Sequence, residues 1–175
     1  MENNNQEKIM GESIRVICRI RPLNALEKSK NSPTCVSFPG SNAISVGGKQ
    51  YTFDSVLQPN VSQQQAYEVI GRPIVDSVLN GYNGTIFVYG QTSSGKTHTM
   101  EGRLKDPEHQ GIIPRIIEEI FEHIEKMDGN LEFVLKVSYF ELYLEKIKDL
   151  FDGMSNLNIK FLSNKGQSAC ERRQK

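Results

Sequence analysis

The stretch Gly90-Gln91-Thr92-Ser93-Ser94-Gly95-Lys96-Thr97 directly follows the apolar run Thr85-Ile86-Phe87-Val88-Tyr89. It fits Gly-x-x-x-x-Gly-Lys-Ser/Thr, the pattern of the phosphate-binding P-loop. In that motif the glycines let the backbone wrap a polyphosphate, so that successive N–H groups point inward at the positive end of the following helix. The sequence therefore predicts a nucleotide site at these eight residues, and the alternative is an ordinary turn rich in glycine and serine.

Two side chains of the motif have separate predicted roles. Lys96 is expected to reach the β- and γ-phosphates as a cation. The Thr97 hydroxyl is expected to be a ligand of the Mg²⁺ ion that accompanies the nucleotide. The predicted ligands are therefore a nucleoside triphosphate and Mg²⁺.

The composition argues against several classes of partner. The chain has 175 residues, of which 37% are hydrophobic, enough apolar material for one core. Lys plus Arg and Asp plus Glu both number 21, so no global field attracts nucleic acid or an anionic membrane. No stretch approaches the roughly 18 apolar residues of a membrane span, and the polar start lacks an apolar signal segment. We expect a cytoplasmic protein.

The cysteines argue against a disulfide framework. Cys18, Cys35 and Cys170 are odd in number and widely spaced, a pattern that fits neither paired disulfides nor a zinc site. Cys18 lies in an apolar run and is expected to be a small core residue.

The first part of the chain predicts β-structure. Residues 1–12 are expected to be a disordered lead-in. Ser13–Arg21 alternates apolar residues with arginines, as in a strand with one buried face, and Pro22 should end it. Between Thr34 and Val56, short β-prone pieces separated by glycines predict a small antiparallel meander.

Helical patterns dominate the middle of the chain. Ser62 is the predicted N-cap of a helix that Gly81 stops, with a kink or break near Gly71 because Pro73 lies within the segment. Thr85–Tyr89 is expected to be a buried strand at the sheet centre, followed by a helix that begins at about Gly95.

Further along, Gly102–Gly111 is expected to be an inserted loop, and Ile113–Met127 a long amphipathic helix. The wet face of that helix is expected to carry Glu118, Glu119, Glu122 and Glu125. Leu131–Tyr143 predicts a strand and Leu144–Phe151 a short charged helix. The alternation of strands and helices around a P-loop predicts an α/β sheet.

Several further stretches closely resemble the kinesin motor domain, above all conventional kinesins. They are Arg19–Asn24, Tyr51–Val56, Gly81–Met100, Gly111–Arg115 and Val137–Tyr143, and the resemblance runs from about Ser13 to Ile159. It implies an α/β P-loop NTPase of the kinesin-motor type, with a central mixed β-sheet flanked by helices. Residues 13–159 would be the N-terminal half of such a domain, and residues 160–175 a divergent, disordered tail.

The resemblance also implies ligands and partners. It implies binding of ATP with Mg²⁺, hydrolysis of ATP coupled to movement along microtubules, and a location at the cytoskeleton. Arg19, Arg21 and Pro22 would flank the adenine, with His98 near the ring from the other side. Guanidinium and imidazole planes can stack on a purine, which agrees with these roles. The alternatives are an exposed strand arginine at position 19 and an ordinary helix histidine at position 98.

Motifs that the family uses for hydrolysis are missing from these 175 residues. The sequence has no Asn-x-x-Ser-Ser-Arg-Ser-His switch I and no Asp-Leu-Ala-Gly-Ser-Glu switch II. These elements sense the γ-phosphate and position the attacking water. We therefore predict no catalytic residue and no ATP turnover by this chain alone. The alternative to a motor is a non-motile nucleotide-binding or decoy protein.

Overall fold

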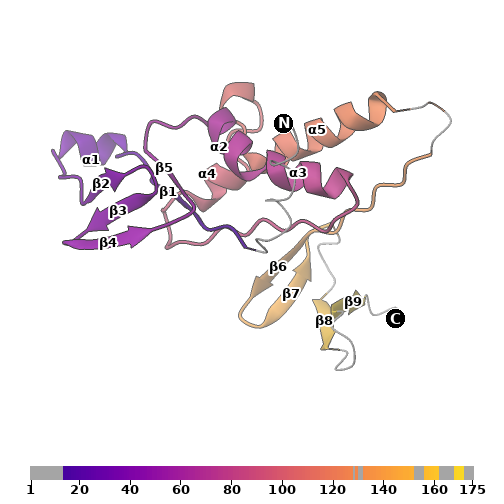
Figure 1. Cartoon of the computed structure of the whole chain (residues 1–175). Helices are drawn as coiled ribbons and strands as arrows, with labels where there is room; N and C mark the ends of the chain where they lie inside the picture. The colour runs from indigo at the N-terminus through magenta and orange to yellow at the C-terminus, as the bar shows by residue number, and fades with distance from the viewer. Residues whose placement is uncertain (1–13, 128, 130–131, 152–155, 162–167, 172–175) are drawn as a thin grey trace. The chain divides into compact units, whose positions relative to one another are not determined.

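The computed structural model describes residues 14–127, 129, 132–151, 156–161 and 168–171 (Figure 1). The chain divides into two compact units, Met1–Met127 and Asp128–Lys175. The predicted disordered lead-in, residues 1–12, lies outside the described residues. No helix in the described part is long and apolar enough to cross a membrane.

The first unit begins with a small β-lobe (Figure 1). Its elements are β1 (Ile17–Arg19), α1 (Ala25–Ser29), β2 (Val36–Gly40), β3 (Ala43–Val46), β4 (Lys49–Thr52) and β5 (Ser55–Leu57). Strands β2, β3 and β4 form an antiparallel sheet, which confirms the predicted meander. Strand β1 pairs in parallel with β5. It covers only three residues of the predicted strand 13–21, because β5 offers a partner to those three alone.

Two helices follow, α2 (Gln63–Ile70) and α3 (Arg72–Leu79). Ser62 caps α2 as predicted, since its side chain accepts from the N–H of Gln65 and the Gln65 side chain accepts from the N–H of Ser62. The predicted break at Gly71 is also confirmed. Any side chain at Gly71 would place its Cβ 2.5 Å from the Tyr67 ring, so glycine is required for the close passage.

The longest helix is α5 (Ile112–Glu125), which packs against α2 and α3. Glu118, Glu122 and Glu125 are exposed as predicted, but the prediction was wrong for Glu119. Glu119 is half-buried, accepts a hydrogen bond from the Tyr67 hydroxyl and lies 3.8 Å from Arg72 Nε. Burial and this carboxylate both raise the pKa of Tyr67 above its ordinary value. Tyr67 is only 3% exposed, so its hydroxyl needs a hydrogen-bond partner within the protein, and Glu119 of α5 is that partner.

Tyr67→Phe should therefore destabilise the first unit. The change leaves the half-buried Glu119 carboxylate without its hydroxyl donor, which should cost about 2 kcal/mol of unfolding free energy. Urea titration followed by circular dichroism measures the loss. Tyr51→Phe is the matched control, because the Tyr51 side chain is 48% exposed on β4. Equal stability of the two variants would contradict a stabilising role for the Tyr67 hydroxyl.

The expected central strand Thr85–Tyr89 is not a strand. Its main chain forms no backbone hydrogen bond with other described residues. The side chains still alternate: Ile86 and Val88 are half-buried, whereas Phe87 is 82% and Tyr89 88% exposed. The apolar pattern is that of a strand, but a strand exists only through hydrogen bonds to a neighbour, and the described residues supply none.

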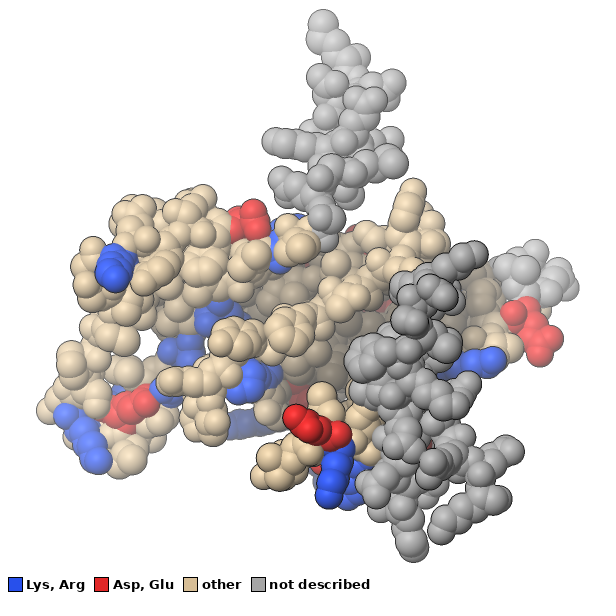
Figure 2. Space-filling view, turned by 90° about the horizontal axis from the view of Figure 1, so that it is seen from below, with Lys and Arg blue, Asp and Glu red and all other residues tan. Residues whose placement is uncertain are grey.

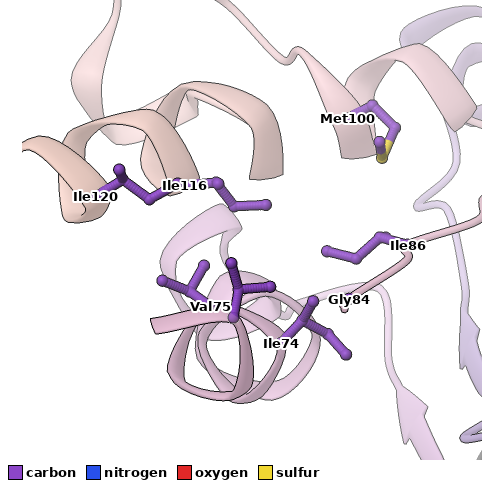
Figure 3. Close-up of a pocket in the computed structure, with 8 residues that line it drawn as sticks. Ile74, Val75, Gly84, Ile86, Met100, Ile116 and Ile120 are labelled. Atoms are coloured by element: carbon purple, nitrogen blue, oxygen red, sulfur yellow. The ribbon is translucent and has the colours of Figure 1, made fainter. Parts of the chain in front are cut away.

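An apolar cavity of about 180 Å³ lies beside this segment (Figure 3). It is lined by residues of α3, α5, the end of α4 (Lys96–Met100) and the extended segment: Ile74, Val75, Val78, Gly84, Ile86, Met100, Ile116 and Ile120. The core is therefore incompletely filled between the helices and the unpaired segment.

The second unit is built of strands. These are β6 (Phe140–Tyr143), β7 (Lys146–Asp149), β8 (Asn156–Phe161) and β9 (Ser168–Glu171), antiparallel in the order β6-β7-β8-β9. The prediction of a strand over Leu131–Tyr143 was too long, since residues 132–139 carry no strand and Leu131 lies outside the described residues.

The predicted helix Leu144–Phe151 is wrong. Leu144 and Glu145 have φ values of 49° and 61° and form a two-residue turn between β6 and β7, which is the geometry that matches the twist of a hairpin. Of the predicted tail 160–175, residues 160 and 161 belong to β8 and residues 168–171 to β9, and residues 162–167 and 172–175 lie outside the described ones; the disorder of this tail stays a prediction.

The surface carries both signs of charge. Figure 2 shows one face on which blue and red residues are scattered and other residues predominate. This distribution agrees with the equal numbers of basic and acidic residues.

Candidate nucleotide-binding site

The P-loop residues form an irregular turn that leads into α4. Ser93 and Gly95 have φ values of 66° and 101°. Gly95 is the N-cap of α4, and a left-handed conformation of this kind favours glycine. The first N–H groups of a helix have no partner within the helix, and no side chain caps those of α4. Such N–H groups are suited to an anion.

Lys96 lies across the start of the loop. Its Nζ donates to the carbonyl oxygens of Gly90, at 2.8 Å, and Gln91, at 2.9 Å. These bonds hold a half-buried ammonium group at the turn. An ammonium group has three donors, so one remains for a further acceptor such as a phosphate oxygen.

The structure brings together two segments that carry residues predicted to flank the adenine, the end of β1 and helix α4. Arg19, at the end of β1, donates from Nη1 to Thr99 Oγ1 in α4, at 3.2 Å. Burial, followed by the guanidinium charge of Arg19, lowers the pKa of His98 below its ordinary value. The structure therefore places Arg19 beside the residue that follows His98, although 80 positions separate Arg19 from Thr99 in the sequence.

A buried glutamine ties α4 to the inserted loop. Gln63 Nε2 donates to the carbonyl oxygens of His98, at 2.6 Å, and His109, at 3.3 Å. His109 belongs to the 3₁₀ helix η2 (Pro107–His109), and its Nδ1 lies 2.8 Å from Asp106 Oδ2. The loop predicted at 102–111 is thus ordered by contacts with α2 and α4.

Arg21 and Pro22 have other hydrogen-bond partners in the structure. The Arg21 guanidinium makes two bonds to the Glu27 carboxylate, at 3.0 and 2.7 Å, and Nη1 also donates to the Pro22 carbonyl at 3.1 Å. Glu27 in turn belongs to the capping box that Asn24 forms at the start of α1. Both predicted adenine neighbours are exposed, and the Arg21 charge is already paired. Their role at the base stays a prediction.

The predicted magnesium ligand Thr97 is exposed at the first turn of α4. In the described part of the chain, His, Cys, Asp and Glu residues form no group of three that could hold a metal by themselves. A magnesium ion at Thr97 would therefore need phosphate oxygens and water as its remaining ligands, as in P-loop sites.

The environment of His98 predicts a pH dependence of stability. Burial, followed by the nearby Arg19, His109 and Arg103, lowers the pKa of His98 below its ordinary value of 6.5. The unfolded chain then binds the proton more readily than the folded chain, so the unfolding free energy should fall as the pH falls below 6.5.

Urea midpoints at pH 7.5 and pH 5.5 measure this effect, and His98→Gln should reduce the difference between them. The same pH dependence in both proteins would contradict the assignment to His98.

A glycine-rich turn with a lysine, which leads into the N-terminus of a helix within an α/β unit, defines a P-loop nucleotide-binding protein. The family model of the kinesin motor domain matches residues 19–171. The chain belongs to the kinesin motor domain family.

Relatives and a solved structure agree with this. The chain is 58% identical over 140 residues to kinesin heavy chain of Doryteuthis pealeii and to kinesin heavy chain isoform 5A of Homo sapiens. Each match covers 80% of this chain and 14% of the relative. A solved structure of a fast kinesin has a TM-score of 0.82 at 38% identity, over 91% of this chain and 46% of the solved one. The chain thus spans less than half of that structure.

Sequence reasoning missed Gln63 and Thr99 at this site, and also Glu27, which pairs with Arg21. Gln63 and Thr99 carry no motif, because their roles depend on contacts between distant segments. Glu27 had a usable signal: Asn24 stands three residues before it, as in a capping box.

Proposed function

We propose that Gly90–Thr97 binds the phosphates of Mg-ATP, and that this chain is the ATP-binding part of a microtubule-based motor. The observation that carries the proposal is the loop itself. Lys96 closes the turn by its bonds to Gly90 and Gln91, and the helix that follows begins at Gly95 without a side-chain cap. This places a cation and free backbone donors in one short segment.

The residues present fit the proposed ligand. Lys96 retains a donor for the β- and γ-phosphates, and the exposed Thr97 hydroxyl is available to Mg²⁺. On the base side, Arg19 and His98 would stack against adenine. The bound magnesium would supply charge neutralisation between the phosphates, while the protein holds the triphosphate in place.

The proposed partner is the microtubule, and the proposed location is the cytoskeleton. Support comes from membership of the kinesin motor domain family and from the solved fast kinesin, whose description refers to its ATPase mechanism and its interactions with microtubules. Movement along microtubules coupled to ATP hydrolysis is proposed for the motor as a whole.

For these 175 residues by themselves, we propose nucleotide binding without turnover. The sequence contains neither of the two switch motifs, and so lacks the residues that position the attacking water. A chain of this kind could also act as a non-motile nucleotide-binding or decoy protein.

Calorimetric titration of the 175-residue chain with Mg-ATP tests the proposal, with circular dichroism of the same sample to verify folding. The expected result is saturable binding at one site, with no phosphate release in the presence or absence of microtubules. A folded chain that does not bind Mg-ATP would overturn the nucleotide site. Phosphate release that microtubules accelerate would overturn the proposed lack of turnover and support a complete motor activity.

A further inference from the structure

In the described part of the first unit, two polar side chains are buried: Gln63 is 5% and Thr99 8% exposed. They come from different helices, and both form hydrogen bonds at the same end of α4. Burial of a polar side chain is costly unless its hydrogen bonds are satisfied, so side chains in such places are held in fixed positions.

Thr99 holds Arg19 in a way that leaves the guanidinium available to a ligand. The Thr99 hydroxyl accepts from Arg19 Nη1 at 3.2 Å and is uncharged, so the full charge of the arginine remains. Arg21, two residues further on, is instead neutralised by the Glu27 carboxylate at 2.7 Å. Of these two arginines, Arg19 is therefore the one whose guanidinium charge can interact with an aromatic ring or an anion of a ligand.

Gln63 fixes the backbone next to this arginine. Its amide group donates to the carbonyl oxygen of His98 and to that of His109, so both of its N–H groups are used. The last turn of α4 cannot shift without breaking one of these bonds. Thr99 therefore presents its hydroxyl to Arg19 from a fixed position.

We infer that Thr99, supported by Gln63, is a positioning residue that orients Arg19 against the base of the bound nucleotide. The inference rests on the proposed function, since it assigns the base contribution to the affinity of that same site. The phosphate contribution belongs to the P-loop and does not depend on Thr99. Removal of the hydroxyl should thus weaken binding of ATP but not binding of a ligand without a base.

The test compares Mg-ATP with Mg-tripolyphosphate, which has no base, by calorimetry on the full chain. Wild-type protein should bind Mg-ATP more tightly than Mg-tripolyphosphate. Thr99→Val should weaken Mg-ATP binding about tenfold, the size of a cation–π contact, and leave Mg-tripolyphosphate binding unchanged. Thr99→Ser keeps the hydroxyl and should behave like the wild type. Gln63→Leu should show the same selective loss as Thr99→Val.

A double mutant tests whether Thr99 acts through Arg19. Arg19→Ala should lose the same base contribution, and Thr99→Val in that background should cause no further loss of affinity. If Thr99→Val does not fold by circular dichroism, Arg19→Lys decides, because lysine keeps the charge but lacks the planar guanidinium. Arg19→Lys should then weaken Mg-ATP binding alone.

The outcomes separate the two proposals. A folded wild-type chain that binds neither ligand overturns the proposed function itself. Equal affinity of the wild type for both ligands overturns this inference and leaves the phosphate site intact. An equal loss of both affinities in Thr99→Val, or additive losses in the double mutant, also overturns it, since Thr99 would then support the site as a whole.

Discussion

Lys96→Ala should reduce the affinity of the chain for Mg-ATP by about 100-fold, the value of a hydrogen-bonded charge at a phosphate. Lys96 is the P-loop cation, and Gly90 and Gln91 hold its ammonium group at the mouth of the loop. Alanine removes this charge and leaves the backbone N–H groups as the remaining phosphate ligands. Calorimetric titration with Mg-ATP measures the change.

A matched control separates this effect from a general loss of positive charge. Lys49→Ala makes the same change in net charge at an exposed position of β4 and should leave the affinity unaltered. Thermal unfolding of both variants checks the fold, because Lys96 also bonds to two carbonyl groups. An affinity in Lys96→Ala equal to that of the wild type would rule out the P-loop assignment.

Local signals predicted the elements around the P-loop well. The Ser62 cap, the break at Gly71 and the helix that begins at Gly95 each depend on residues within a few positions of one another. The meander at residues 36–52 was predictable for the same reason, since short turns join its strands. Family membership was also predictable, because the motifs occur in the expected order and the family model matches.

Predictions that depended on distant partners failed. Thr85–Tyr89 and residues 132–139 have apolar patterns suited to strands, yet neither segment is a strand: among the described residues, Thr85–Tyr89 forms no backbone hydrogen bond, and in residues 132–139 the Tyr139 carbonyl accepts from the Leu150 N–H at 2.9 Å. Strand identity is set by hydrogen bonds across a sheet, which a local pattern cannot supply.

The prediction of a helix where β6 and β7 form a hairpin failed for a different reason. Its turn consists of Leu144 and Glu145, both with positive φ, a conformation that sequence normally signals by glycine or asparagine. The charged run from Leu144 to Phe151 therefore resembled a short helix. Buried Ile147 shows that alternation along β7, and not helical periodicity, places the side chains.

The P-loop motif of the candidate site could be predicted from the sequence, but the residues that hold its neighbours in place could not. The eight P-loop residues are contiguous in the sequence, and the structure gives them a closed turn. Arg19 and His98 were named from family resemblance, and the structure bonds Arg19 to Thr99, the residue that follows His98. Gln63 and Thr99 were not named, since their hydrogen bonds join segments 35 and 80 residues apart.

Gly102→Ala should destabilise the first unit by about 3 kcal/mol or more, a large part of the 5–15 kcal/mol typical of a domain. Gly102 has a φ of 64°, and a Cβ there would lie 2.2 Å from the His109 carbonyl oxygen and 2.5 Å from the Gly111 nitrogen. Both are backbone atoms, so no side-chain rotation can relieve the clash. Urea titration followed by circular dichroism measures the loss.

The displacement that this clash causes should also affect the nucleotide site. Two backbone hydrogen bonds hold the segments around Gly102 and Gly111 together. The Arg103 N–H donates to the His109 carbonyl and the Gly111 N–H to the Glu101 carbonyl, both at 2.9 Å. Separation of these segments pulls the His109 carbonyl from Gln63, which also holds His98. Gly102→Ala should therefore weaken Mg-ATP binding as well as stability.

Gly48→Ala is the control that isolates the clash from the backbone strain. Gly48 also has a positive φ, 80°, but a Cβ there meets no atom within 4 Å. Alanine at position 48 thus carries only the cost of the left-handed conformation, about 1 kcal/mol. The excess loss in Gly102→Ala then measures how tightly the backbone of the 102–111 loop is packed. Equal losses in the two variants would mean that the loop moves aside freely, and that its contact with Gln63 does not hold α4 in place.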